Sequence, residues 1–204
     1  MTTAPTRLPL AAGLSAILLL AGGVEQRAAA EPALFEIDDS HLAIAFLVRH
    51  IGYADTLGQF LEAEGSFRYD EATQALSELE VTIQADSVFT NHDKRDAHLL
   101  GGDFLDADNH PEITFVGTGA QASGEDSGTV TGDLTILGVT KPITLQVTKN
   151  KAGAYPFGEG PPYVIGVSVR GTVKRSEFGM SYAVENGFVG DEIDVIIEFE
   201  AVRQ

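Results

Sequence analysis

The sequence predicts an all-β domain, an antiparallel barrel or sandwich of eight or nine strands with one short helical segment. Most of the chain alternates apolar and polar residues with the period of two that half-buried strands require. The alternating segments are joined mainly by short turns, and helical periodicity is confined to one segment after residue 90. Even spacing and one-sided alternation are typical of antiparallel rather than parallel sheets.

Residues 1–30 are expected to be a signal peptide and residues 31–204 the folded domain. Arg7 supplies a positive charge, residues 8–24 are almost continuously apolar, and three alanines at 28–30 fit a cleavage site. The apolar run is short for a membrane span, so a retained anchor is the weaker alternative. We therefore expect an exported protein, periplasmic or secreted, that begins near Glu31.

The net charge is −17, and removing residues 1–30, which carry Arg7, Arg27 and Glu25, changes it to −17 − 1 = −18. Nucleic acid and anionic membrane surfaces need a basic partner, so this acidity argues against both. The chain has no cysteine, so its stability in an oxidising compartment must come from packing and backbone pairing.

Three strands are predicted before the helix. Residues 41–50 (HLAIAFLVRH) form the clearest of them, followed by residues 57–69, with Gly58 and Gly65 as bend or bulge sites, and residues 76–86. In the first strand one face consists of large apolar groups and a terminal histidine, and we expect it to point inward. This face comprises Leu42, Ile44, Phe46, Val48 and His50.

The alternation stops in residues 90–115, where a short helix is predicted. Asn91 is a candidate cap, and Gly101 with Gly102 would end the helix. On such a helix Arg95, His98 and Leu99 share a face, while Asp96 projects about 100° away. The helix could close one end of a barrel or be a solvated connector, and its position alone does not decide between them.

Five further segments complete the predicted domain. Strands are expected at residues 113–120, 129–137, 143–150, 164–174 and 191–202, and the second and third of these form a hairpin around residues 137–140. The last strand alternates cleanly, with Val195, Ile197 and Phe199 on its dry face. Residues 153–162 contain three prolines and three glycines, and form either a flap over an opening or a plain surface loop.

The chemistry available to the chain is limited. It has no cysteine nucleophile, G-x-S-x-G elbow, P-loop or G-x-G-x-x-G turn, and its histidines lack the i, i+4 spacing of helical metal ligands. Charged residues nevertheless occur where a barrel should close. If Arg95 or Arg175 pairs with Asp96, the pair is a structural salt bridge; if one stays partly free, it can receive a polar head group whose tail lies in an apolar interior.

Several motifs together resemble the YceI-like family, from about residue 35 to residue 201. They are DSH leading into IAFLVRHIG, RDAHLL within residues 85–115, LTILGVTKPITL, KRSEFGM and VGDEIDVIIEFEA. The resemblance implies an extended, lipocalin-like antiparallel barrel that binds polyisoprenoid chains, such as isoprenoid quinones or prenyl phosphates, in its interior. It places Arg95, Asp96, His98 and Leu99 on the family's R-D-x-H-L, Phe104 on the following aromatic, and Arg175 and Phe178 on R-x-x-F-G.

We therefore predict a non-enzymatic carrier whose ligand is an isoprenoid lipid, with no other cofactor and no metal. Its partners would be the lipid, a second copy in a homodimer, or a membrane protein. One alternative is an enzyme that uses His98 and Asp96 as an acid/base pair on a small amphiphile. Another is a structural domain whose interior is filled by its own side chains.

Overall fold

The computed structural model describes residues 1–2 and 31–204, so the predicted signal peptide lies almost wholly outside the described residues. The single α-helix of the described part is α1 (Asp93–Leu99), and short 3-10 turns occur at Asp39–His41, Ala85–Ser87 and Arg175–Phe178. The strands are β1 (Ala33–Ile37), β2 (Ala43–His50), β3 (Ala54–Phe60), β4 (Ala63–Asp70), β5 (Ala75–Gln84), β6 (Val88–Phe89), β7 (Glu112–Ala122), β8 (Ser127–Ile136), β9 (Val139–Ala154), β10 (Tyr163–Lys174) and β11 (Val189–Arg203).

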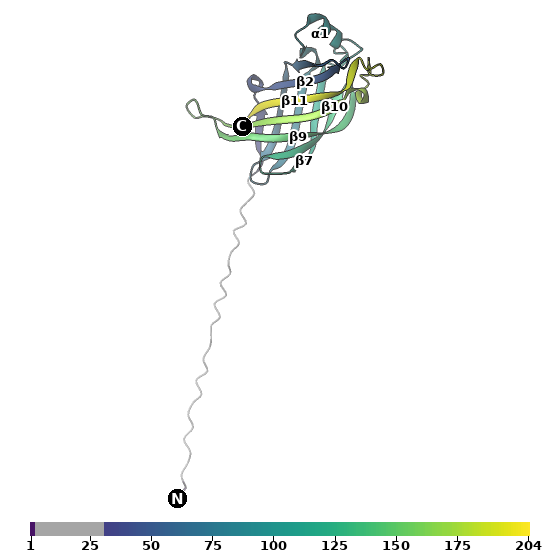
Figure 1. Ribbon diagram of the computed structural model, residues 1–204. Helices are drawn as coiled ribbons and strands as arrows, with labels where there is room; N and C mark the ends of the chain where they lie inside the picture. The colour runs from purple at the N-terminus through teal and green to yellow at the C-terminus, as the bar shows by residue number, and fades with distance from the viewer. Residues whose placement is uncertain (3–30) are drawn as a thin grey trace.

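The strands form a closed antiparallel barrel, which confirms the predicted fold class (Figure 1). Eight of them close the ring in the order β1, β4, β5, β7, β8, β9, β10 and β11, and β11 pairs back to β1. β2, β3 and β6 continue the wall from β11, because β11 pairs with β2 along residues 193–198 and with β1 near its end. Closure leaves the ring without a free edge.

The predicted strand at residues 57–69 is in fact two strands, β3 and β4, separated at Leu61 and Glu62. Neither glycine is a bend. Gly58 pairs in register with Phe46, and Gly65 with Val81. The irregularity in β4 instead falls between Ser66 and Arg68. Splitting the segment lets β3 extend the wall beside β2 while β4 pairs with β1 in the ring.

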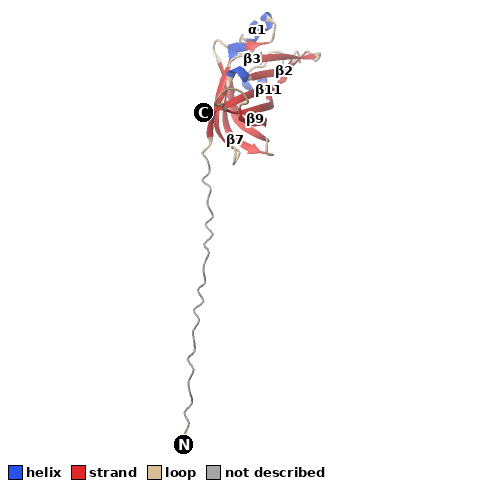
Figure 2. Ribbon diagram, turned by 90° about the vertical axis from the view of Figure 1, so that its left-hand side faces the viewer, coloured by secondary structure: helices blue, strands red, loops and turns tan. Residues whose placement is uncertain are grey.

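The helix α1 lies at one end of the barrel (Figure 2). Its N-cap is His92, whose Nδ1 accepts a hydrogen bond from the Arg95 amide, and not Asn91 as predicted. Asn91 lies one residue before the cap, and its positive φ of 59° turns the chain so that the helix begins after His92. The helix ends at Leu99, shortly before the two predicted glycines. No helix in the described part of the chain is long and apolar enough to cross a membrane.

The second half of the barrel follows the prediction closely. β8 and β9 form a hairpin in which Leu137 and Gly138 both have positive φ, as in a type I′ turn. The return strand begins at Val139, earlier than the predicted residue 143. The segment between β9 and β10 projects from the barrel as a surface loop (Figure 1), and the side chain of Phe157 at its tip is 74% exposed.

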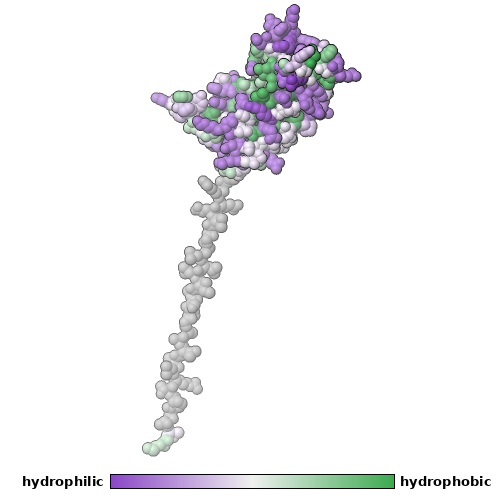
Figure 3. All heavy atoms as spheres, viewed as in Figure 1, coloured by the Kyte–Doolittle hydropathy of each residue, from purple (hydrophilic) through white to green (hydrophobic). Residues whose placement is uncertain are grey.

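Apolar side chains pack along the inner wall, and the face of the barrel seen in Figure 3 is mainly hydrophilic, with hydrophobic areas near the α1 end. Phe35 on β1 is fully buried, and its ring stacks on Phe67 of β4 with 5.5 Å between centroids. Ala201 on β11, also fully buried, pairs with Ile37. Burial of apolar surface contributes about 25 cal/mol per Å², and it therefore helps to hold a seam at which β1 and β11 pair at only three positions.

Candidate ligand-binding cavity

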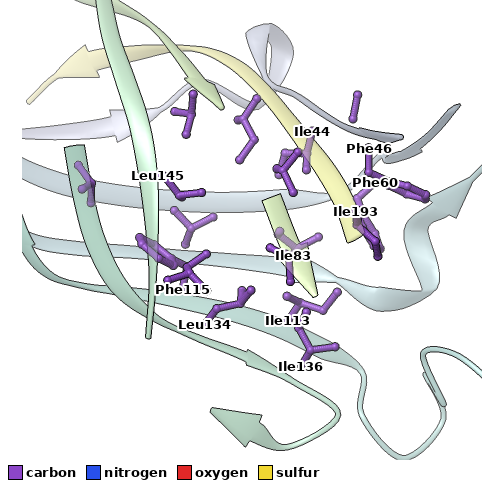
Figure 4. Close-up of a pocket in the computed structure, with 18 of the residues that line it drawn as sticks. Ile44, Phe46, Phe60, Ile83, Ile113, Phe115, Leu134, Ile136, Leu145 and Ile193 are labelled. Atoms are coloured by element: carbon purple, nitrogen blue, oxygen red, sulfur yellow. The ribbon is translucent and has the colours of Figure 1, made fainter. Parts of the chain in front are cut away.

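The barrel encloses a cavity of about 670 Å³. Its wall is almost entirely apolar and is formed by side chains from strands all round the ring (Figure 4). Representative members are Ile44, Phe60, Ile83, Ile113, Leu134 and Leu145. A volume of this size lies within the range of about 300–1,000 Å³ that is typical of small-molecule sites. The cavity excludes the alternative of an interior filled by its own side chains.

Inward-facing glycines help to explain why the interior is hollow. Side chains can fill the inside of an eight-stranded barrel. Here, however, Gly58, Gly132 and Gly171 occupy inward positions, and a large side chain from the neighbouring strand lies over each of them. A Cβ at Gly58, for example, would stand 2.1 Å from Cζ of Phe46. The large side chains therefore lie against the wall and leave the centre of the barrel open.

Most of the predicted site residues line this cavity. They include the inward faces of β2 and β11, and they also include residues of α1 and of the loops at its end of the barrel. The full set is Leu42, Ile44, Phe46, Val48, His50, Arg95, His98, Leu99, Phe104, Arg175, Val195, Ile197 and Phe199. Asp96 and Phe178 are not part of the wall; Phe178 is instead buried in the core. Arg95, His98 and Leu99 of α1 line the cavity, so the helix borders this end of the barrel, although none of its residues is buried.

Thr90 organises the charged face of α1. Its amide and hydroxyl both donate to Oδ1 of Asp96, and its own Oγ1 and carbonyl oxygen accept hydrogen bonds from Arg95 at 2.6 and 2.7 Å. Arg95 and Asp96 are thus linked through Thr90, and within residues 31–204 they form no direct ion pair. The hydrogen bonds from Thr90 lower the pKa of Asp96, which keeps this carboxylate ionised.

Arg175 is a buried structural residue. Its side chain is 1% exposed, and its guanidinium donates to four backbone carbonyl oxygens at 2.7 to 3.0 Å, those of Met180, Tyr182, Val189 and Gly190. It also lies 5.8 Å from the centre of the Phe104 ring. Burial lowers the pKa of the Arg175 guanidinium, and the nearby Asp191 carboxylate partly opposes this change. Arg175 neither pairs with Asp96 nor stays free for a head group; it holds the chain between β10 and β11 in place.

His98 is paired with a different carboxylate from the predicted one. Its Nε2 lies 3.0 Å from Oδ2 of Asp103, whereas Asp96 is held by Thr90. The His98 ring also packs edge-on against Phe104 and Tyr182, with centroids 5.0 and 5.2 Å apart. The acid/base pair of His98 and Asp96 considered from the sequence is therefore not formed.

The opposite end of the barrel supplies polar lining that sequence reasoning missed. Lys149 Nζ lies 3.2 Å from Oδ1 of Asp126, and Gln74 donates to the Glu125 carbonyl oxygen at 2.7 Å. All four residues line the cavity, which thus extends from α1 to the far turns. Strand alternation marks Lys149 only as one polar residue among many, so no pattern in the sequence distinguishes it. The inward residues of β5, β7, β8 and β10 were also missed, although the same alternation identifies them.

A histidine and carboxylate cluster lies outside the cavity. Nδ1 of His41 is 2.8 Å from Oδ2 of Asp38 and 4.0 Å from Oε2 of Glu200. Asp38 also accepts hydrogen bonds from the amide and hydroxyl of Ser40. Asp38 is thus the N-cap of the 3-10 turn between β1 and β2, and this capping role explains why the cluster forms.

Comparisons with known proteins agree with the fold. The model of the YceI-like domain matches residues 35–201. A UPF0312 protein of Pectobacterium carotovorum is 36% identical over 170 residues, which are 83% of this chain and 85% of that protein. A UPF0312 protein of Pseudomonas aeruginosa is 36% identical over 191 residues, 93% of this chain and 97% of that protein.

Two solved structures are also similar. A YceI protein of Campylobacter jejuni superposes with a TM-score of 0.69 at 31% identity, covering 76% of this chain and 90% of that one. A domain of Saccharophagus degradans, described as polyisoprenoid binding and implicated in plant cell wall breakdown, gives a TM-score of 0.63 at 16% identity. It covers 85% of this chain and 99% of its own, and at this identity the likeness concerns the fold alone.

Proposed function

This chain belongs to the YceI-like family, and we propose that it is an exported, non-catalytic carrier that holds an isoprenoid lipid inside the barrel. The observation that carries the proposal is the apolar cavity of about 670 Å³ that runs between the two ends. The polyisoprenoid-binding description of the Saccharophagus degradans domain supports the same class of ligand.

The cavity suits a long hydrocarbon better than a compact polar molecule. Apolar side chains line its length, and polar groups gather only near the ends. A five-carbon unit that buries roughly 100 Å² of apolar surface contributes about 2.5 kcal/mol before ordering costs, at about 25 cal/mol per Å². Affinity then grows with the number of units enclosed, which favours an isoprenoid tail.

The head group of the lipid would lie at the α1 end. Arg95 and His98 line the cavity there, and both residues are exposed. Arg175 lines the same region, but its buried guanidinium serves the backbone, so we assign it no head-group contact. This arrangement accepts a quinone ring or a prenyl phosphate, and titration of both distinguishes them.

Native mass spectrometry of freshly isolated protein, followed by lipid extraction, tests the proposal. We expect a bound mass that matches an isoprenoid lipid, and uptake of an isoprenoid quinone or prenyl phosphate by ligand-free protein. Protein that is isolated empty and takes up neither lipid in titration would contradict the function. The same spectra report whether the protein is a monomer or a homodimer.

Export is a separate part of the proposal and rests on the sequence of residues 1–30. N-terminal sequencing of protein from the periplasmic and culture fractions tests it. We expect a chain beginning near Glu31, and a full-length chain retained in the cytoplasm would contradict it.

A further inference from the structure

Four exposed apolar side chains lie in two joined loops at the α1 end of the cavity, and we call them the apolar rim. They are Ile51 and Tyr53 in the turn between β2 and β3, and Tyr182 and Phe188 in the loop before β11. Tyr53 is 89% exposed, Phe188 54% and Ile51 46%. The Ile51 amide donates to the Phe188 carbonyl oxygen at 2.9 Å, which joins the two loops. Hydrophobic surface is visible near the α1 end in Figure 3.

The apolar rim is continuous with the inside of the barrel. Ile51, Tyr182 and Phe188 belong to the cavity wall as well as to the exposed surface. An apolar ligand can therefore move from the outer surface into the cavity while it stays in contact with apolar side chains. Exposed apolar groups that lead into a cavity indicate an interaction site and not scattered surface residues.

Ile51 carries a conformational cost as well. It has a φ of 51° and precedes Gly52 with a φ of 74°, the values of a type I′ turn, in which asparagine and glycine are favoured. Among the described residues it is the only β-branched one with positive φ. Leu137 occupies the equivalent place in the turn between β8 and β9, but it packs against the core, which accounts for an apolar residue there. Ile51 is half exposed, so packing does not explain its identity.

The one cation in the strand that leads into the apolar rim is paired, since Nε of Arg49 lies 2.9 Å from Oδ1 of Asp55. Glu185, in the same loop as Tyr182 and Phe188, is exposed and forms no ion pair within residues 31–204, so the charge left beside the rim is negative. The chain as a whole is strongly acidic. An anionic surface would be repelled by this net charge, whereas an uncharged apolar surface would not. Tyrosine side chains also favour the boundary between lipid and water.

We propose that the apolar rim docks on the surface of a zwitterionic lipid bilayer, so that an isoprenoid chain moves between the bilayer and the cavity without crossing water. This inference rests on the proposed function, because a docked rim is useful only if the cavity holds a lipid. Contact with the acyl region would bury the four side chains that the fold leaves exposed.

Flotation with phosphatidylcholine vesicles tests the inference, using ligand-free protein that comprises residues 31–204. We expect the wild-type protein to float with the vesicles, and Tyr53→Ser or Ile51→Asn to weaken its partitioning by roughly tenfold. The matched control is Phe157→Ser, since Phe157 is 74% exposed, between Ile51 and Tyr53, but lies in the loop between β9 and β10, outside the cavity wall. This variant should float like the wild type, and added phosphatidylglycerol should not strengthen binding.

Wild-type protein that stays in the soluble fraction, or a Phe157→Ser variant that loses as much binding as Tyr53→Ser, would overturn the inference. Light scattering that shows a dimer disrupted by Tyr53→Ser would also overturn it, because the apolar rim would then be covered by a second copy of the chain.

Titration with detergent-dispersed isoprenoid quinone separates the two proposals. Tyr53 does not line the cavity, so Tyr53→Ser should take up quinone like the wild type. Quinone uptake without vesicle binding would reject docking alone, and absence of uptake in both proteins would reject the proposed function.

Discussion

The ring of Phe115 on β7 occupies the space that a side chain at Gly132 on β8 would fill: a Cβ there would stand 2.3 Å from Cζ of Phe115. A Cβ there would also stand 2.6 Å from the carbonyl oxygen of Val116, so we expect Gly132→Ala both to push this ring toward the barrel axis and to displace the backbone where β7 pairs with β8. Overpacking of this kind costs roughly 1–3 kcal/mol of unfolding free energy, and the narrower cavity should bind isoprenoid quinone more weakly. Urea denaturation and quinone titration measure the two effects.

Gly119→Ala is the control for that substitution, because no atom lies within 4 Å of a Cβ at Gly119. It should leave both stability and quinone affinity close to the wild type. Identical behaviour of the two variants would show that the glycine at position 132 does not keep the cavity open.

Arg175→Met should be strongly destabilising. The substitution preserves much of the side-chain volume but leaves four buried or partly buried carbonyl oxygens without this donor. We expect a loss of at least about 3 kcal/mol in unfolding free energy, measured by urea denaturation. Lys174→Met is the matched control, since this neighbouring cation is exposed and pairs with Glu192 only at 3.9 Å; its cost should stay below about 0.5 kcal/mol. A stable Arg175→Met protein that fails to bind lipid would reveal a head-group role for Arg175.

Thr90→Val should destabilise the protein in a pH-dependent way. The hydroxyl of Thr90 is the main cause of the lowered pKa of Asp96. A carboxylate with a lowered pKa stabilises the fold above its unfolded pKa of about 3.9, and this contribution is lost as the pH falls through the folded value. The difference between variant and wild type should therefore be about 1–2 kcal/mol at pH 7 and shrink below about pH 4. Urea denaturation at pH 7 to pH 2.5 measures it. Thr90→Ser keeps the hydroxyl and should retain most of the stability, and a pH-independent loss in Thr90→Val would exclude Asp96 as the cause.

Ile51→Asn should stabilise the protein while it weakens vesicle binding. Asparagine tolerates the left-handed conformation that costs other residues about 1–2 kcal/mol, and little packing is lost at a half-exposed position. We expect unfolding free energy to rise by about 1 kcal/mol in thermal or urea denaturation. Leu137→Asn shares the turn geometry but removes core packing, so it should not stabilise. If Ile51→Asn destabilises the protein as much as Leu137→Asn, the side chain of Ile51 serves the fold and not docking.

The sequence predicted the barrel well because each inward face has a period of two. β2, β5 and β11 were identified from this alternation, and the same faces line the cavity. It predicted local chain direction less well. Gly58 was predicted to be a bend or bulge. In the structure it lies under the ring of Phe46 from the neighbouring strand, and no local sequence pattern reveals this cross-strand contact. Asn91 has the composition of a cap, yet its positive φ makes His92 the cap.

The candidate site was predicted in its apolar part and less well in its charged part. The sequence shows that Arg95, Asp96 and Arg175 are charged, but it does not show which of these side chains is buried. Only the fold shows that Arg175 faces four carbonyl oxygens and that Thr90 separates Arg95 from Asp96. Lys149 was missed for the same reason, since its place at the far end depends on pairings between distant segments.

The closing strand of the barrel is also the last element of the chain. β11 pairs with β10 on one side and with β1 and β2 on the other. Before its fifteen residues are in place, β1, β2 and β10 each lack one neighbour, and their apolar inner faces are exposed to water and to other chains. The ring therefore closes only when β11 has paired on both sides. A lipid held as proposed above would have to enter a barrel that is already closed, so the proposal requires an opening in the folded wall.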